Sequence, residues 1–164
     1  MVKISQKIVP HLWLEKDADK AAEFYVSVFK NSRILKTSYY PEAAEEVSGQ
    51  KKGSVMTVGF VLEGQEFMVL NGGPAFKLNE AVSFMVFCEN QKEIDYFWDK
   101  LSFVPESEQC GWLKDKFGLS WQIVPTILDT MITDKDPQKV ERVTAAFLKM
   151  KKFDISALQK AYEG

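Results

Sequence analysis

The chain has 164 residues, of which 46% are hydrophobic and 27% charged, as is usual for a soluble globular protein with one packed core. A formal net charge of -2 gives no sign of the basic face that nucleic-acid-binding proteins need, and no apolar run is long enough to span a membrane. The N-terminus lacks the features of a signal peptide, and two cysteines are too few for a disulfide scaffold, so we expect a reduced cytoplasmic protein.

The first half of the chain predicts a strand followed by a helix. Residues 7–14 are predicted to form the strand, in which Pro10 favours an edge position or a bulge. Asp17 or Asp19 is expected to cap the helix, because apolar side chains recur at helical spacing after them. This helix must cover one face of a sheet.

Three further strands are predicted after this helix. Residues 32–40 form the first of them, and the polar, glycine-bearing residues 41–53 are expected to form a surface loop. Residues 54–62 and 66–70 then pair in a hairpin that turns at Gly64. Neither face of 54–62 is charged, so we expect the helix to cover one face and a pocket or partner the other.

The second half of the chain repeats this order. Residues 81–88 predict a strand, Asn90 caps a helix, and residues 110–113 and 119–125 pair across a turn at Gly118. Apolar side chains follow each predicted cap at the same offsets. They are Phe24 and Val28 after Asp17, and Phe97 and Leu101 after Asn90. Such a duplication predicts two copies of one unit that enclose a cleft.

The last forty residues differ in character from both copies. Asp136-Pro137 predicts an N-cap followed by proline at the first helical position, and Asp154 predicts the cap of a final short helix. No long linker divides the chain. We therefore expect one α+β domain over residues 1–164, with modules at about 5–74 and 80–125 and a helical tail at 126–164.

Several stretches match a known family. They are residues 21–34, 53–58, 71–74, 110–115 and 117–125. On these residues the chain resembles the PhnB-like branch of the vicinal oxygen chelate superfamily, which includes glyoxalase I, extradiol dioxygenases, and fosfomycin- and bleomycin-resistance proteins. The resemblance implies paired βαβββ modules, a curled mixed eight-stranded sheet around a cleft, a C-terminal helical extension and a homodimer.

The branch also carries the name 3-demethylubiquinone-9 3-methyltransferase. A nucleotide-like methyl donor would be expected to bind a glycine fingerprint in a turn between a strand and a helix. The sequence shows no such fingerprint. We therefore do not expect methyltransferase activity.

The resemblance also implies where a metal would be bound. In the metal-using relatives, ligands come from the first strand of each module and the last strand of each hairpin, and these positions correspond to Pro10, Met68, Ser83 and Gln122. Proline cannot ligate, a thioether is a soft ligand, and a hydroxyl or an amide holds a hard divalent ion weakly. The chain has one histidine in total. We expect no metal and no other cofactor.

Two residues are candidates for catalysis. By strand alternation His11 should point away from the pocket and be packed against backbone, unless a bulge at Pro10 turns it inward as a base or a ligand. Glu66 shares a face with Met68 and is either a carboxylate at the rim of the cleft or a general base.

Four residues are candidates for ligand binding. Trp121 and Ile123 read as core residues, so alternation sends Gln122 to the concave face, where its amide offers a donor and an acceptor; alternatively it bonds to neighbouring strands. Met68 and Ser83 occupy related positions in the repeat. Trp13 is one of the aromatic residues that would suit a flat or hydrophobic ligand.

Three functions remain open. The favoured one is a metal-free protein that binds an apolar or aromatic small molecule in the cleft. The alternative is a metal-dependent glyoxalase-like lyase, isomerase or dioxygenase, in which a divalent ion would stabilise an enolate and His11 and Glu66 would take part. The third is a dimeric interaction module that docks through its helical tail.

Overall fold

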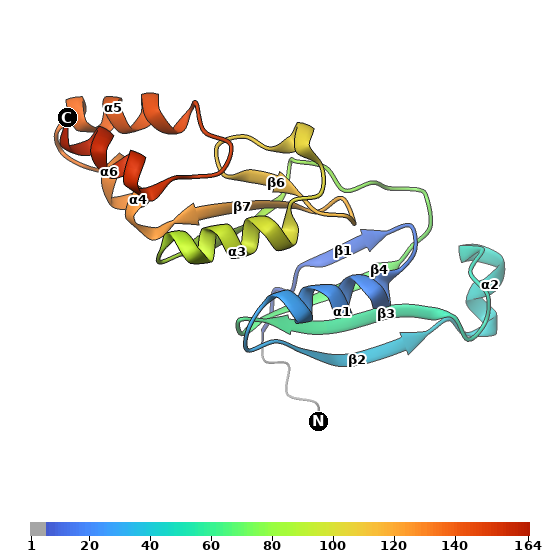
Figure 1. The fold of residues 1–164 in the computed structure, drawn as a ribbon. Coiled ribbons are helices and arrows are strands. Elements are labelled where there is room, and N and C mark those ends of the chain that lie inside the picture. The colour runs from blue at the N-terminus through green and yellow to red at the C-terminus, as the bar shows by residue number, and fades with distance from the viewer. Residues whose placement is uncertain (1–5) are drawn as a thin grey trace. The chain divides into compact units, whose positions relative to one another are not determined.

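The computed structural model describes residues 6–164, which form two compact units with the boundary after Leu78. Unit one contains the first predicted module, and unit two contains the second module and the helical tail (Figure 1). Within the described residues, no helix is both long and apolar enough to cross a membrane.

Unit one is a four-stranded sheet with a helix on one face. Its elements are β1 (His11–Leu14), α1 (Ala18–Val28), β2 (Arg33–Tyr39), α2 (Glu42–Ser48), β3 (Val55–Leu62) and β4 (Gln65–Asn71). The strand order is β1-β4-β3-β2, with β1 parallel to β4 and the other pairs antiparallel. Under α1 lies an aromatic core, in which the Tyr25 ring stacks 5.9 Å from that of Phe60 and Phe60 stacks 5.5 Å from Phe67.

The start of α1 differs from the prediction. Asp17 occupies the N-cap position, but its side chain makes no capping bond and pairs with Lys20 at 2.7 Å. The Oδ1 atom of Asn71 accepts the hydrogen bond from the Ala18 amide at 2.8 Å, and Asn71 Nδ2 donates to the Val55 carbonyl at 3.0 Å. Asn71 therefore ties the first turn of α1 to the end of β4.

The loop predicted over residues 41–53 is partly helical. Residues Glu42–Ser48 form α2, which Pro41 precedes and which ends at Gly49 with φ 68°. Alanine and glutamate favour this helix, since they lose little side-chain entropy on forming it. None of its residues is buried, so the segment does lie on the surface as predicted.

Unit two repeats the order with one strand fewer. Its elements are β5 (Ser83–Cys88), α3 (Gln91–Leu101), a 3-10 turn (Pro105–Ser107), β6 (Trp112–Lys114), β7 (Ser120–Pro125), α4 (Thr126–Ile132), α5 (Pro137–Phe147) and α6 (Ile155–Glu163). The strand order is β5-β7-β6, with β5 parallel to β7. The predicted caps are confirmed: Asn90, Asp136 and Asp154 each accept a hydrogen bond from a backbone amide of the following helix.

The α+β class, the repeated module and the helical extension are confirmed, but the number of strands differs. Residues 6–164 form seven strands in sheets of four and three, where eight strands in one sheet were expected. The counterpart of β2 would lie between α3 and β6. That segment contains Pro105 in a 3-10 turn and an isolated bridge between Gln109 and Trp112, and proline cannot donate to a ladder.

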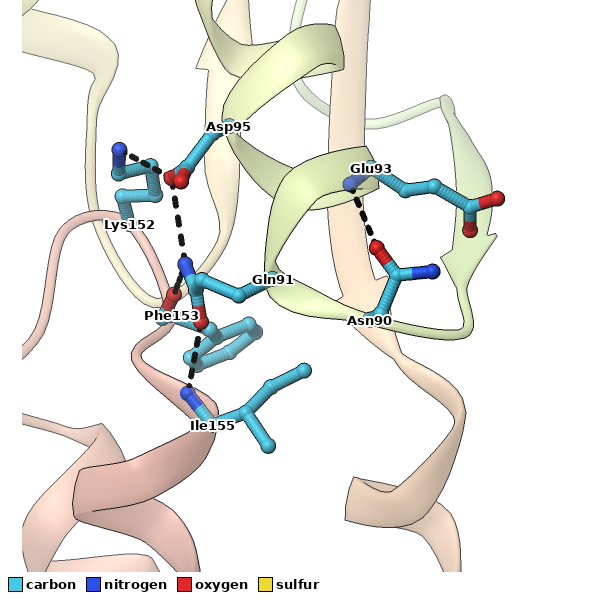
Figure 2. Close-up of polar contacts among 7 residues, drawn as sticks. All are labelled: Asn90, Gln91, Glu93, Asp95, Lys152, Phe153 and Ile155. Atoms are coloured by element: carbon cyan, nitrogen blue, oxygen red, sulfur yellow. Dashed lines mark hydrogen bonds and ion pairs between the residues drawn. The ribbon is translucent and has the colours of Figure 1, made fainter.

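The helical extension is joined to α3 by the side chain of Gln91 (Figure 2). Gln91 Nε2 donates to the Phe153 carbonyl at 3.0 Å, and Gln91 Oε1 accepts from the Ile155 amide at 2.9 Å. Lys152 pairs with Asp95 at 2.5 Å beside this contact. The Phe153 side chain is buried and lies against Gly111. One glutamine thus holds the backbone on both sides of the α6 cap.

Candidate functional site

The face of the unit-one sheet opposite α1 carries four of the predicted site residues. Leu12 and Val69 pair in register and are buried under the helix. Because strand neighbours alternate, His11 and Met68 project from the other face, and Trp13 and Glu66 share it. His11 is exposed and Met68 is 38% exposed.

The predicted orientation of His11 is corrected by the register of β1 on β4. The Met68 amide donates to the Pro10 carbonyl at 2.9 Å, and this bond sets His11, rather than Pro10, beside Met68. His11 therefore needs no bulge to reach the open face. The position inferred from the family was Pro10, which is one residue before the residue that pairs with Met68. The pairing of the strands, and not the length of the turn before α1, fixes which residue lies beside Met68.

Trp13 is held in place by the segment that follows β4. Its indole N–H donates to the Gly73 carbonyl at 2.9 Å, and its ring meets the Phe76 ring edge-on at a centroid distance of 5.0 Å. A Cβ atom at Gly72 would collide with the indole ring. The polar atom of Trp13 is thus already bonded, and the half-buried ring is what remains to contact a ligand. Its role in binding stays a prediction.

Glu66 lies two residues from Met68 on the same face and is half-buried. Its backbone amide donates to Gln6 Oε1 at 3.1 Å. The shared face agrees with the sequence pattern. Whether Glu66 acts as a base stays a prediction.

The unit-two sheet also has one covered and one open face. Leu113, Trp121 and Ile123 are buried on the side where α3 packs. The opposite face carries Met85, which is 47% exposed, and Phe87, which is 60% exposed. Both are large apolar side chains on the strand that was predicted to carry Ser83. Alternation along residues 83–88 was the signal that could have identified them.

Gln122 and Ser83 are brought together on this open face. Gln122 Nε2 donates to Ser83 Oγ at 2.8 Å, a diagonal contact, since Met85 is the in-register partner of Gln122 and Ser120 that of Ser83. Gln122 therefore lies on the uncovered face and also bonds to a neighbouring strand. Its role in ligand binding stays a prediction. In unit two, Met85 of β5 is the in-register partner of Gln122 of β7. In unit one, His11 of β1 is in the same way the partner of Met68 of β4.

The donor atoms at these positions suit a hard divalent ion poorly. In unit one they are an imidazole and a thioether, and in unit two a thioether, a hydroxyl and an amide. Within the part of the chain that the structure describes, no three histidine, cysteine, aspartate or glutamate side chains are grouped so that they could hold a metal ion.

The two thiols are free, and one is deeply buried. Burial raises the pKa of the Cys88 thiol to about 12, with a smaller contribution from Glu93. A thiol with this pKa stays protonated at neutral pH and is a poor nucleophile. The Cys110 thiol, two residues before β6, donates to the Phe147 carbonyl at the end of α5 at 3.6 Å.

A cavity of about 320 Å³ lies between the starts of α3 and α6. Glu89, Asn90 and Asp154 line it, and the latter two already accept capping hydrogen bonds (Figure 2 shows Asn90). The carboxylates of Glu89 and Asp154 lie next to the positive N-terminal ends of these two helices. It contains none of the predicted site residues.

A family model described as 3-demethylubiquinone-9 3-methyltransferase matches residues 6–124, so α4, α5 and α6 lie beyond the match. The PhnB protein from Bacillus cereus is 36% identical, with a TM-score of 0.60, and the match covers 74% of this chain and 100% of that one. Protein PA1353 from Pseudomonas aeruginosa is 17% identical, with a TM-score of 0.54 and coverages of 74% and 98%.

The fosfomycin resistance protein FosX from Listeria monocytogenes is 14% identical, with a TM-score of 0.53, and the match covers 80% of this chain and 99% of that one. At these identities the likeness to FosX and to PA1353 is one of fold alone. The comparison with curated proteins gave no match.

Proposed function

This chain belongs to the 3-demethylubiquinone-9 3-methyltransferase family, within the vicinal oxygen chelate superfamily, and we propose that it is a metal-free protein that binds a small apolar or aromatic molecule. The observation that carries the proposal is the set of residues at the two sheet positions described above. Met68 stands beside His11 in unit one, and Met85 stands beside Gln122 in unit two. These pairs favour apolar contact with a few uncharged polar groups over chelation.

The exposed apolar side chains support the same proposal. Met85 and Phe87 lie on the open face of one sheet and Met68 on that of the other, in each case next to polar atoms. Apolar walls with a few placed polar groups are typical of ligand sites. Methionine and phenylalanine adapt well to a flat or aromatic molecule.

We do not propose that this chain transfers a methyl group, although the family is named for a methyltransferase. The turns that follow the first strand of each unit are Glu15-Lys16-Asp17 and Glu89-Asn90, and neither contains a glycine. A nucleotide-like methyl donor would need the backbone to approach its ribose closely at such a turn. We therefore propose binding rather than methyl transfer.

Elemental analysis tests the metal-free part of the proposal. The protein should be purified without chelators and without a nickel column, and its metal content measured by inductively coupled plasma mass spectrometry. We expect no metal in stoichiometric amount. One bound transition metal or magnesium ion per chain would contradict the proposal.

A metal-dependent lyase, isomerase or dioxygenase is the second candidate, and the placement of His11 favours it. His11 is exposed on the open face, with Glu66 two residues from its neighbour Met68. If this candidate holds, His11→Ala removes Mn²⁺ or Zn²⁺ binding in a titration, while Lys36→Ala, on the opposite edge strand β2, leaves it unchanged. Equal metal binding by both variants and the unchanged protein would eliminate it.

We further propose that the protein is a cytoplasmic homodimer. The superfamily resemblance motivates the dimer, and two free cysteines suit a reducing compartment. Sedimentation equilibrium at micromolar concentration should give twice the chain mass of 18.7 kDa. A single species at the chain mass would contradict the dimer.

A further inference from the structure

We infer that the open face of unit two binds its ligand through a neutral hydrogen-bonding group, such as a carboxamide, held by Ser83, Ser120 and Gln122. The inference rests on the proposed function and specifies the class of ligand. All three residues belong to one unit and one sheet.

The three side chains form one patch. Ser83 of β5 and Ser120 of β7 are in-register partners, and Gln122 lies two residues further along β7 on the same face. The hydrogen bond from Gln122 Nε2 to Ser83 Oγ, at 2.8 Å, fixes the amide in place between the two strands. A ligand therefore meets a positioned set of groups rather than mobile side chains.

The hydrogen-bonding capacity of this patch is only partly used. Gln122 uses one N–H, which leaves its Oε1 as an acceptor, and Ser83 uses its oxygen, which leaves its O–H as a donor. Ser120 is 1% exposed, and its hydroxyl has no hydrogen-bond partner among residues 6–164. A buried hydroxyl without a partner destabilises the fold, so its presence calls for a group that pairs with it.

The charges around the patch favour a neutral ligand group. Lys114 of β6 is the in-register partner of Ser120, and its ammonium forms an ion pair with Glu80, which precedes β5. The two charges cancel next to the patch. A carboxylate would therefore gain no net attraction from this pair and would meet the Gln122 carbonyl oxygen, whereas a carboxamide presents an acceptor to the serines and a donor to Gln122.

The same ion pair gives a route to Ser120. Its partners come from the two sides of β7, and both side chains are partly exposed. Exposed ion pairs of this kind contribute little to stability, so the flexible Lys114 chain can move aside as a ligand enters.

The apolar part of the ligand has neighbours on the same face. Met85 is in register with Gln122, and so is Trp112 on the other side. Phe87 follows one alternation beyond Met85. The ligand class is therefore an aromatic or apolar body that carries one neutral carbonyl group with an attached N–H.

Three probes of nearly equal shape test this inference. They are 1-naphthamide, its apolar isostere 1-isopropenylnaphthalene, and the anion 1-naphthoate, titrated calorimetrically into the full-length protein. We expect the amide to bind about fivefold more tightly than either of the others, because it alone completes the hydrogen bonds. Equal affinity for the amide and the isostere, or tighter binding of the anion, would overturn the inference.

Variants at Ser83 and Gln122 test whether these residues cause the preference for the amide. Ser83→Ala and Gln122→Leu should each abolish the preference for the amide over the apolar isostere. Gln159→Leu, an exposed change on α6, is the matched control and should keep the preference. A preference that survives both site variants would overturn the inference.

Ser120→Ala separates a ligand role from a structural one. Removal of an unpaired buried hydroxyl should leave the urea midpoint unchanged or raise it, while the preference for the amide falls. A lower midpoint together with an unchanged preference would show that Ser120 serves the fold alone.

Failure of the inference and failure of the proposed function give different results. If the protein binds the isostere but does not prefer the amide, the proposed function stands and only the inference fails. If none of the three aromatic probes binds, both fail together.

Discussion

His11 lies beside Met68 in the parallel pairing of β1 with β4, and the bond between the Met68 amide and the Pro10 carbonyl fixes that position. The only histidine of the chain is thus exposed on the open face of unit one. Its neighbour is a thioether, which binds hard divalent ions poorly. The same relation recurs in unit two, where Met85 stands beside Gln122. Both modules therefore place methionine where a chelating pair would be needed.

Asn71 and Asp17 differ in what they do for the start of α1. Asn71→Ala removes the acceptor of the Ala18 amide and the donor to the Val55 carbonyl, so we expect a loss of about 1–3 kcal/mol in unfolding free energy. Asp17→Ala removes only an exposed ion pair with Lys20, and about 0–1 kcal/mol is expected. Urea denaturation measures both. A larger loss for Asp17→Ala would contradict this account of the helix start.

Gly111 and Gly118 form a second matched pair, since both have left-handed φ angles, 82° and 85°. A Cβ atom at Gly111 would collide with the Phe153 ring and lie 2.9 Å from the Ile123 carbonyl oxygen, whereas none of the described atoms comes near one at Gly118. Gly118→Ala should cost about 1–2 kcal/mol for backbone strain alone. Gly111→Ala should cost more than about 3 kcal/mol. Equal losses of unfolding free energy for the two variants, measured by thermal unfolding, would show that Phe153 of the tail does not pack closely against Gly111.

Gln91 and Lys152 test how the tail is attached to α3. Gln91→Ala leaves the Ile155 amide and the Phe153 carbonyl without their partner, and a loss of about 1–3 kcal/mol is expected. Lys152→Ala breaks the exposed ion pair with Asp95 and should cost about 0–1 kcal/mol. Limited proteolysis after α5 should be faster for the Gln91 variant alone. Equal cleavage of both variants would show that Gln91 does not anchor the helical tail to α3.

The buried thiol of Cys88 predicts a dependence of stability on pH. Burial raises its pKa from 9.0 to about 12, so between these values the unfolded chain loses a proton that the folded chain keeps. The free energy of unfolding therefore falls as pH rises above 9.0, by up to about 1.4 kcal/mol per pH unit from this group. Its contribution is fully present below 9.0.

Cys88→Ala isolates that contribution. Although the variant loses some packing at all pH values, its stability should fall less steeply than that of the unchanged protein between pH 8 and 10.5, by about 2 kcal/mol in total. Identical slopes would show that the thiol ionises in the folded state as it does in the unfolded chain.

Local signals in the sequence predicted what depends on neighbouring residues. Asn90, Asp136 and Asp154 cap their helices as expected, because a cap bonds to an amide two or three residues away. The cap at Asp17 was not predictable, since its role passes to Asn71, which is distant in sequence and is positioned by β4. The missing strand of unit two follows from Pro105, whose effect a repeat-based alignment of modules does not register.

The sequence predicted on which face of a sheet each candidate residue lies, but not which residues contact one another there. Alternation placed Gln122 opposite Trp121 and Ile123, and it lies there. The partner of Gln122 and the facing of His11 depend on the register between strands, which no single strand encodes. The Ser120 hydroxyl, which has no partner among the described residues, has no signal in the sequence, because a small polar residue at that position is usually hydrogen-bonded.

Titration of 1-naphthamide with and without a chelator tests whether the protein holds its ligand without a metal ion. The protein should be dialysed against EDTA, and the dissociation constant compared with that of protein dialysed against Mn²⁺ or Zn²⁺. We expect the same dissociation constant in all three samples, because no ion takes part in holding the ligand. Binding that disappears with EDTA and returns with either metal would contradict it.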